Sequence, residues 1–305
     1  MDYSIKNAIK NLGGDSVIFD FPMSKYTTIR AGGNAEVLFR AGNLEGLREV
    51  LLFLVQEQVP YLTIGKGSNL LVLDGGLDGV VIILGGSLAF VDDDKIVDPG
   101  LFAGSAIALP KLVAYCAKNG LAGIEFLAGI PGTLGGAIAM NAGSMGKEIK
   151  DVVLEVSFLN RKGEIDRKDV SELKFQYREL AFNAGDIILS ARLNLVADQP
   201  SLIKDRIFKN IKDRNAKFPF NMPSAGSIFK NPDGDYAGRL IELSGLKGKG
   251  IGGAVISNEH GNVIVTKGET SASDIVELMN LAKNRVKELF NITLTPEIKI
   301  VGKPH

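Results

Sequence analysis

The sequence is poor in the residues that build covalent or metal cross-links, with one cysteine and two histidines among 305 residues. A single cysteine, Cys116, cannot form a disulfide framework or a thiolate metal site. Because Cys116 lies in an apolar, helix-like stretch, we interpret it as a buried, unreactive thiol. His260 and His305 form no cluster with other metal ligands, so we predict no metal site.

An excess of charge of one sign is also absent, since 35 basic residues balance 35 acidic ones. Nucleic-acid-binding proteins usually carry a basic excess, so we expect no such partner. The six basic residues of 204–217 alternate with apolar ones, and we interpret them as the solvated face of a helix. No apolar run approaches the roughly 20 residues that span a bilayer, and no signal-peptide pattern is found. We therefore expect a soluble, cytoplasmic protein without membrane partners, and a monomer by default.

Length and composition indicate more than one folded domain. A chain of 305 residues usually exceeds one compact core, and its 45% hydrophobic content is ordinary for a globular protein. Strand-like and helix-like segments follow one another from Glu36 onward, with a second unit beginning near Ser87 and a third near Pro200. This pattern predicts an α+β architecture with mixed sheets.

Periodicity and capping residues predict individual elements. Asn43 can cap a helix, and Ser271 with Asp274 forms a capping box for a helix that ends near Phe290. Residues 92–94, three aspartates, indicate a turn between strands. One helical face is predicted at Leu202, Ile203, Ile207 and Ile211. Strands are further predicted at residues 36–40, 61–64, 70–73, 80–84, 152–160, 164–167, 186–196 and 297–301, and helices at 44–55, 110–119 and 237–244.

Two glycine-rich loops lie in the first half of the chain. The first, residues 65–69 (Gly-Lys-Gly-Ser-Asn), follows a strand, and its glycines allow backbone amides to approach a phosphate. It is not a P-loop, because Gly67 stands where Ser or Thr should follow the lysine. Taken alone, this loop is typical of a tight turn.

The second loop, residues 129–143, is denser in glycine and contains Pro131, Thr133 and Asn141. It lacks the Gly-x-Gly-x-x-Gly fingerprint of dinucleotide-binding folds, which argues against a reductase that uses NAD alone. Two such loops together favour a flat or phosphorylated ligand over two ordinary turns.

These loops and the segments that follow them resemble the UDP-N-acetylenolpyruvoylglucosamine reductase family. Downstream, the serine-bearing segment 224–232 is specific to that family. The resemblance runs from about Tyr26 to Gly302, nearly the whole chain. The matching segments are residues 26–33, 65–71, 123–126, 129–132, 135–137, 140–143, 177–178, 224–232, 246–248, 251–254 and 294–297.

The resemblance implies a flavoenzyme with three domains. These are two FAD-binding subdomains of the vanillyl-alcohol-oxidase type, residues 1–86 and 87–198, and an α+β substrate-binding domain, residues 199–305. NADPH would reduce the FAD, and the reduced flavin would reduce the enolpyruvyl ether of a UDP-sugar in peptidoglycan precursor synthesis. FAD is expected to be held without a covalent bond by Gly65, Lys66, Gly67, Ser68, Asn69, Leu70, Gly129, Pro131, Gly132, Thr133, Gly135, Gly136, Ala137, Asn141 and Gly143.

Three matched residues fit the chemistry of reducing an unsaturated carboxylate. Hydride addition at the β-carbon builds negative charge on the carboxylate, for which Arg178 supplies a permanent donor fork. Glu297 would hold the same carboxylate or, when protonated, donate a hydrogen bond to it. Ser227 would deliver the proton to the α-carbon, with Lys230 as a nearby cation. Tyr177, Lys230 and Asn231 are the expected substrate-binding residues.

The chain departs from the family pattern at Leu180, Phe218, Val263 and Thr266. No tyrosine lies between Arg178 and Ser227, which indicates the shorter of the family's subgroups and leaves the residues that cover the diphosphate undefined. Two alternatives remain. A related FAD oxidase or dehydrogenase of a sugar or hydroxy acid would keep the glycine loops without the serine segment. A non-catalytic nucleotide-binding module would bind no flavin.

Overall fold

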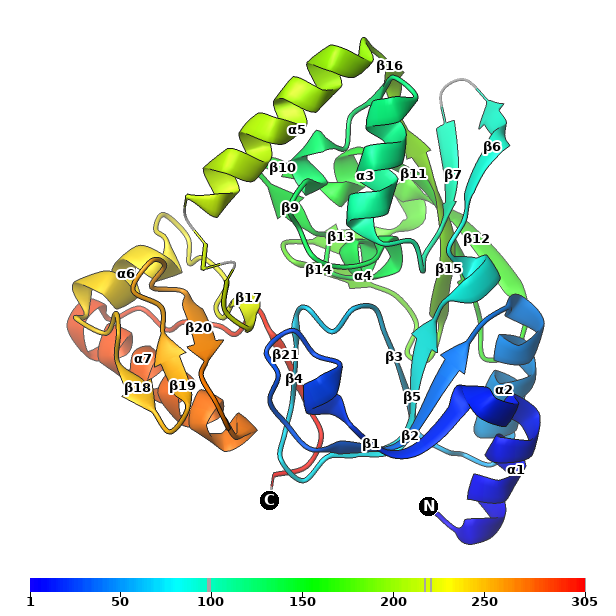
Figure 1. Ribbon diagram of the computed structural model, residues 1–305, viewed down its shortest axis with the longest axis horizontal. Helices are drawn as coiled ribbons and strands as arrows, with labels where there is room; N and C mark the ends of the chain where they lie inside the picture. The colour runs from blue at the N-terminus through cyan, green and yellow to red at the C-terminus, as the bar shows by residue number, and fades with distance from the viewer. Residues whose placement is uncertain (98–99, 217, 220, 305) are drawn as a thin grey trace. The chain divides into compact units, whose positions relative to one another are not determined.

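The computed structural model describes residues 1–97, 100–216, 218–219 and 221–304. The chain folds into two compact units, each assembled from segments that are distant in the sequence (Figure 1). The first unit comprises Met1–Phe19, Val37–Gly65 and Gly79–Asp213. The second comprises Asp20–Glu36, Lys66–Asp78 and Arg214–His305. The three consecutive domains expected from the sequence stay a prediction.

A four-stranded sheet in the order β1-β2-β5-β3 is formed by the first part of the chain. Helices α1 and α2 lie against each other beside this sheet, and their apolar faces supply Ile9, Leu47 and Leu51 to its core. Asn43 caps α2, as predicted, by accepting a hydrogen bond from the Gly46 N–H. The bounds are α1 Tyr3–Gly13, β1 Val17–Pro22, β2 Asn34–Ala41, α2 Leu44–Gln56, β3 Tyr61–Ile64 and β5 Leu77–Leu84.

A five-stranded antiparallel sheet in the order β12-β11-β15-β7-β6 forms the rest of the first unit, together with helices α3 and α4. The turn predicted at residues 92–94 is wrong, because these residues lie within β6. β6 is an edge strand, where charged residues are tolerated and discourage pairing with other chains. The bounds are β6 Val91–Val97, β7 Gly100–Gly104, α3 Leu109–Lys118, α4 Leu134–Ala139, β11 Val153–Leu159, β12 Ile165–Asp169 and β15 Ile187–Asn194.

Short hairpins and helix α5 complete the first unit. Ile203 of α5 is buried, whereas Leu202 is 45% exposed, so the predicted apolar face of this helix is wrong at Leu202. Short 3-10 helices occur at Gly14–Ser16, Met23–Lys25, Gly86–Leu88, Glu125–Leu127 (η4), Ile149–Asp151 and Val170–Glu172. The remaining bounds are β8 Leu121–Ala122, β9 Gly143–Ser144, β10 Lys147–Glu148, β13 Lys174–Gln176, β14 Glu179–Ala181, β16 Val196–Ala197 and α5 Pro200–Asn215.

The second unit is built around an antiparallel sheet in the order β17-β20-β19-β18 and helix α7. The predicted capping box of α7 is confirmed, since Ser271 and Asp274 bond to each other's backbone N–H. Strand β4 pairs in parallel with β21. The bounds are β4 Leu70–Val72, β17 Ser224–Ser227, α6 Ala237–Leu243, β18 Gly250–Ile251, β19 Ala254–Ile256, β20 Val263–Thr266, α7 Ala272–Phe290 and β21 Lys299–Val301.

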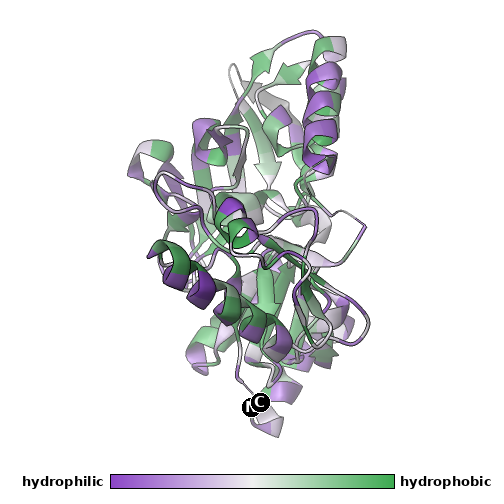
Figure 2. Ribbon diagram, turned by 90° about the vertical axis from the view of Figure 1, so that its left-hand side faces the viewer, coloured by the Kyte–Doolittle hydropathy of each residue, from purple (hydrophilic) through white to green (hydrophobic). Residues whose placement is uncertain are grey.

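The helices of both units are amphipathic, and hydrophilic and hydrophobic residues share their surfaces in Figure 2. In α7, six residues on one side are buried in the core of the second unit: Ala272, Ile275, Leu278, Met279, Ala282 and Val286. Among the described residues, no helix is long and apolar enough to cross a bilayer. Burial of one face of α2, α3 and α7 therefore contributes to the cores that position the loops described next.

Candidate active site

The first glycine loop packs against the segment 26–33 of the second unit. Gly67 has a φ of +64°, and a Cβ at this position would approach the Thr27 Cα to 3.2 Å. The Gly67 carbonyl accepts a hydrogen bond from the Thr28 N–H at 3.3 Å. Only glycine fits this combination of left-handed backbone and close approach without strain. The conformation of the loop is therefore fixed by its packing against residues 27 and 28.

The same loop is anchored on its other side to the C-terminal part of the chain. Asn69 Nδ2 donates to the Glu297 carbonyl at 3.0 Å, and the Lys299 N–H donates to the Asn69 carbonyl at 3.0 Å. Asp74, just beyond β4, accepts hydrogen bonds from the N–H groups of Ala272 and Ser273 at the start of α7. A carboxylate at a helix N-terminus is favourable because it pairs with backbone donors that lack helical partners.

The second glycine loop contains the short helix α4, which the sequence analysis did not predict. Thr133 caps α4 by accepting from the Gly136 N–H, and the Gly135 N–H donates to the Ser105 carbonyl at 2.9 Å. A Cβ at Gly135 would lie 2.8 Å from the Ser105 Cβ, and a Cβ at Gly65 would lie 2.7 Å from the Thr133 Oγ1. The structure therefore brings Gly65 of the first loop against the second loop, inside one unit.

Buried hydroxyl groups beside these loops suit a ligand that offers hydrogen-bond partners. Within the described part of the chain, the hydroxyls of Thr63 and Ser105 in the first unit and Thr27 in the second have no hydrogen-bond partner. Thr63 lies two residues before Gly65, Ser105 contacts Gly135, and Thr27 contacts Gly67. Buried polar groups are normally satisfied, so each such hydroxyl requires an explanation. Within the first unit, the glycine backbone and the unpaired hydroxyls of Thr63 and Ser105 fit a phosphorylated cofactor such as FAD.

Arg178 occupies a strained position at the tip of the β13–β14 hairpin. Its φ is +60°, a left-handed conformation that costs a non-glycine residue about 1–2 kcal/mol. Its guanidinium lies 5.1 Å from the ring centre of the exposed Tyr177, and a Cβ at Gly143 would lie 3.0 Å from its Nη1. Gly143 thus allows the arginine to pack against the second loop. Strain of this kind is concentrated at functional sites.

Asn141, which the sequence analysis assigned to the cofactor, is fully buried and also has a left-handed φ of +41°. Its Nδ2 donates to the Gln176 carbonyl at 2.9 Å and to Glu148 Oε2 at 3.0 Å. Its Oδ1 accepts from the Lys150 N–H at 3.3 Å. The side chain therefore ties the second loop to the hairpin that carries Arg178.

Ser227, Lys230 and Glu297 lie near one another in the second unit. The Glu297 N–H donates to the Ile228 carbonyl at 2.7 Å, and the Lys230 N–H donates to the Thr295 carbonyl at 2.8 Å. The serine-bearing segment and the segment that carries Glu297 are therefore fixed side by side, and all three side chains are half-buried. Arg178 belongs to the other unit.

Asn231 has a backbone partner of its own. Its Oδ1 accepts a hydrogen bond from the Ala237 N–H at 3.1 Å, at the start of α6. The residue is exposed, so a substrate contact remains a prediction for it.

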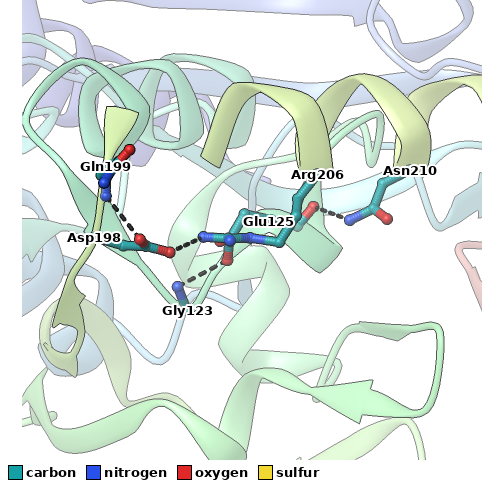
Figure 3. A network of polar contacts seen from close by, with 6 residues as sticks. All are labelled: Gly123, Glu125, Asp198, Gln199, Arg206 and Asn210. Carbon is teal, nitrogen blue, oxygen red and sulfur yellow. Dashed lines mark hydrogen bonds and ion pairs between the residues drawn. The ribbon is translucent and has the colours of Figure 1, made fainter. Parts of the chain in front are cut away.

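A second polar network holds the long helix α5 to the first unit (Figure 3). Glu125 of η4 accepts hydrogen bonds from Arg206 Nε at 2.8 Å and from the Gly123 N–H at 2.7 Å. Arg206 also pairs with Asp198 at 2.6 Å, and this hydrogen bond holds the pKa of the Asp198 carboxyl below its usual range. Asn210 donates to the Glu125 carbonyl at 2.9 Å. Arg206 therefore anchors the helix, although its side chain is 43% exposed. Lys204, Lys209 and Lys212 are exposed as well, which agrees with the interpretation of these residues as the solvated face of a helix.

The departures from the family pattern have packing roles. Leu180 and Val263 are buried in the cores, and the Thr266 hydroxyl donates to the Ile29 carbonyl at 2.8 Å. Phe218 stacks on His260 with ring centres 4.6 Å apart. Burial, together with the positive charges of Lys247 and Arg214, lowers the pKa of His260. The four residues that depart from the family pattern therefore pack in the structure through apolar contacts, ring stacking or a neutral hydrogen bond.

Cys116 is buried, as predicted, and burial raises the pKa of its thiol to about 12. A thiol with so high a pKa stays protonated at neutral pH and is a poor nucleophile. Sequence reasoning missed Asn262, which is buried and bonds through its side chain to Phe229. The only signal was its position directly before β20, which does not reveal a contact 33 residues away.

Comparisons with known proteins agree with this geometry. A family model described as FAD binding domain matches residues 35–167, and one described as UDP-N-acetylenolpyruvoylglucosamine reductase, C-terminal domain, matches residues 218–301. A reductase of that name from Syntrophus aciditrophicus is 40% identical over 99% of this chain and 97% of its own length. Another from Anoxybacillus flavithermus is 40% identical over 92% and 93%. The crystal structure of the reductase from Thermus caldophilus is 36% identical, with a TM-score of 0.80, covering 93% of this chain and 97% of that chain.

The FAD-binding domain, with its two glycine loops, defines the class of the protein as an FAD-dependent oxidoreductase. Both the predicted fold class and the expected FAD cofactor are confirmed. Identity of 40% over nearly the whole chain narrows the class further. The chain belongs to the UDP-N-acetylenolpyruvoylglucosamine reductase family.

Proposed function

We propose that this protein uses NADPH to reduce UDP-N-acetylenolpyruvoylglucosamine to UDP-N-acetylmuramate, in the cytoplasm, as a monomer, for peptidoglycan precursor synthesis. The observation that carries the proposal is the backbone ladder that fixes the segment of Ser227 and Lys230 beside Glu297. These are the residues that a reductase of an unsaturated carboxylate requires and that a sugar oxidase does not. The division into domains 1–86, 87–198 and 199–305 is part of the same proposal.

The two glycine loops are the proposed FAD site, through the backbone of residues 65–70 and 129–143. When bound, the flavin supplies hydride transfer, from NADPH to the β-carbon of the enolpyruvyl group. The hydroxyls of Thr63 and Ser105, both buried without partners among the described residues, are additional candidate contacts. Asn69 and Asn141 already bond to the protein through their side chains, so their part in holding the cofactor is to shape the loops.

Three side chains perform the chemistry on the substrate in this proposal. Arg178 holds the carboxylate and stabilises the charge that develops on it, because a guanidinium is a permanent cation with a planar set of donors. Glu297, in its protonated form, donates a hydrogen bond to the same carboxylate. Ser227 donates the proton to the α-carbon; a hydroxyl is a weak acid, but the carbanionic intermediate is a strong base, and Lys230 lowers the cost of the transfer.

Tyr177 and Asn231, both exposed, are the proposed contacts for the remainder of the substrate. Lys230 serves both purposes, as a cation near Ser227 and as a partner for the nucleotide. Substitution of Tyr177 or Asn231 is expected to raise the KM for the substrate more than it lowers kcat, because these residues do not touch the reacting carbons.

A visible spectrum of the purified protein, recorded without oxygen, tests the proposal directly. We expect a flavin absorption band that bleaches with NADPH and returns when UDP-N-acetylenolpyruvoylglucosamine is added. A band that returns only with oxygen would support the oxidase alternative. A colourless protein that takes up no added FAD would overturn the proposed cofactor site and the function together.

A further inference from the structure

The segment that carries Ser227 is held in an unusual way at the point where strand β17 ends. Ser224 pairs with Val265 and Ser227 pairs with Val263 of β20, so three steps along β17 match two along β20. The irregularity contains Gly226, whose φ is +72°. A bulge of this kind bends the strand and re-aims the side chain that follows it, which here is Ser227.

Beyond Ser227 the ladder is continued by a single residue, Asn262. The Ile228 N–H donates to the Asn262 carbonyl at 2.9 Å. The Phe229 N–H donates to Asn262 Oδ1 at 2.9 Å, and Asn262 Nδ2 donates to the Phe229 carbonyl at 2.7 Å. The side-chain amide therefore bonds to Phe229 as the peptide group of a neighbouring strand would.

Both partners of this contact are buried, with Phe229 2% and Asn262 3% exposed. A buried peptide group that loses its hydrogen bonds is costly, so a chain without the Asn262 amide will shift to find other partners. Phe229 is two residues after Ser227 and directly before Lys230. A shift of Phe229 therefore moves the residues on both sides of it.

We propose that Asn262 is a positioning residue that sets the place of Ser227, with the bulge at Gly226 before the serine and the Asn262 amide after it. The inference rests on the proposed function, in which Ser227 donates a proton to the substrate. Asn262 sets this position through its hydrogen bonds to the backbone of Ile228 and Phe229. In this proposal it touches neither substrate nor cofactor. It extends the set of residues needed for the reaction to one that carries no reactive group.

The experiment uses the FAD-loaded protein and separates two half-reactions by stopped-flow absorbance. In Asn262→Ala, the rate of flavin reoxidation by UDP-N-acetylenolpyruvoylglucosamine is expected to fall roughly 10- to 100-fold, as for a misplacement of about 1 Å. Flavin reduction by NADPH is expected to stay within about twofold of wild type, because it does not use Ser227. A reoxidation rate equal to that of wild type overturns the proposal.

The matched control is Asn160→Ala. Asn160 also bonds through its side chain to the backbone, accepting from the Lys162 and Glu164 N–H groups in the β11–β12 turn of the other unit. Both half-reactions are expected to keep their wild-type rates in this variant. Equal slowing in the two variants would show that loss of any such asparagine contact has the effect, and the specific role of Asn262 would be withdrawn.

A double-mutant cycle with Ser227→Ala distinguishes positioning from a general loss of structure. If Asn262 acts through Ser227, then adding Asn262→Ala to Ser227→Ala slows reoxidation by less than about threefold more. If Asn262→Ala slows reoxidation by the same factor in the Ser227→Ala background as in the wild-type background, Asn262 acts elsewhere. If Asn262→Ala does not fold, Asn262→Asp replaces it. That variant keeps the acceptor for the Phe229 N–H, and reoxidation should recover toward acidic pH, where a protonated carboxyl can donate to the Phe229 carbonyl.

A crystal structure of Asn262→Ala separates this inference from the proposed function. We expect Ser227 to move by about 1 Å relative to Val263. If Ser227 moves but wild-type flavin is not reoxidised by the substrate, the positioning role stands and the proposed function fails. If the wild-type enzyme reduces the substrate but Ser227 stays in place, the proposed function stands and the positioning role fails.

Discussion

The two units hold their chemically important residues by similar contacts but place the backbone strain differently. In the first unit, the strain is on the proposed carboxylate-binding residue itself, since Arg178 has a φ of +60°. In the second unit, the left-handed φ is at Gly226, beside Ser227, and glycine adopts it without strain. In both units a buried asparagine, Asn141 or Asn262, bonds through its side chain to the neighbouring backbone. A long arginine can be aimed from a strained hairpin tip, whereas a short serine must be placed by the backbone.

The largest effect on the rate of flavin reoxidation is expected for substitution of Ser227, which lies in the second unit. In Ser227→Ala, flavin reoxidation by the substrate should fall roughly 10²- to 10⁴-fold, the usual contribution of a general acid. Flavin reduction by NADPH should be unchanged, because it precedes the proton transfer. Stopped-flow absorbance measures both rates. Rapid reoxidation in this variant would refute the proton-donor role.

The corresponding test in the first unit compares Arg178→Lys with Arg178→Gly. Lysine keeps the charge but loses the planar donor set, so we expect the rate of reoxidation by the substrate to fall in both variants, by roughly 10²-fold or more. Glycine also removes the cost of the left-handed φ, so Arg178→Gly should be more stable than Arg178→Lys. Denaturant unfolding measures this difference. Equal stability of the two variants would show that the hairpin stores no strain at this position.

Asn141→Ala sharpens the comparison between the two asparagines. The Gln176 carbonyl and the Lys150 N–H would lose a partly buried hydrogen bond each, at a cost of about 0.5–1.5 kcal/mol per bond. We expect a lower free energy of unfolding, together with slower substrate-driven reoxidation through misplacement of Arg178. Asn183→Ala is the control, because the side chain of Asn183 bonds at the surface to Asp186. A stability like that of the control would remove Asn141 from the support of Arg178.

Glycine substitutions test whether the second glycine loop, in the first unit, is packed too closely to accept a Cβ. A Cβ at Gly135 would lie 2.8 Å from the Ser105 Cβ, whereas one at Gly42 meets no atom within 4 Å. Gly135→Ala should therefore destabilise the protein by about 1–3 kcal/mol and weaken FAD binding, and Gly42→Ala should be close to neutral. Thermal unfolding and flavin release measure the two effects. Full FAD affinity in Gly135→Ala would contradict the assignment of this loop to the cofactor.

The smallest expected effect is the pH dependence that His260 gives to the second unit. Its folded-state pKa is lowered, chiefly by burial, so the unfolded chain binds the proton more readily. The free energy of unfolding should then decrease as pH falls below the ordinary imidazole pKa of about 6.5. Its Nδ1 also accepts the Asn262 N–H at 3.1 Å, which an imidazolium cannot do. Urea unfolding of His260→Gln should show a weaker pH dependence in this range, and an unchanged dependence would assign it to other groups.

The sequence predicted the elements whose signal is local. The Asn43 cap, the Ser271–Asp274 capping box and the β11–β12 hairpin are confirmed because their residues lie close together in the chain. The turn predicted at residues 92–94 was wrong because a run of charged residues is compatible with an edge strand as well as with a turn. Helix α4 was missed because its glycines have low helix propensity, and its packing against Ser105 overrides that preference.

Sequence motifs indicated the residues of the candidate site. They did not indicate the hydrogen bonds between residues that are distant in the sequence. The glycine loops, Arg178, Ser227 and Glu297 were assigned from motifs, and their roles stay predictions. The hydrogen bonds of Asn69 to Glu297, of Asn141 to Gln176 and of Asn262 to Phe229 join residues 228, 35 and 33 positions apart. No periodicity or propensity records such pairings, since they form only when the tertiary structure does.

The parallel pairing of β4 with β21 has a consequence for synthesis of the protein on the ribosome. Residues 70–72 pair with residues 299–301, so the contacts of the first glycine loop with the segment of Glu297 form only after residues 299–301 have been synthesised. Contacts of such long sequence separation form late and slow the folding of a domain. Uptake of FAD should accordingly follow synthesis of β21, and translation intermediates that lack β21 should take up little FAD even when their glycine loops are complete.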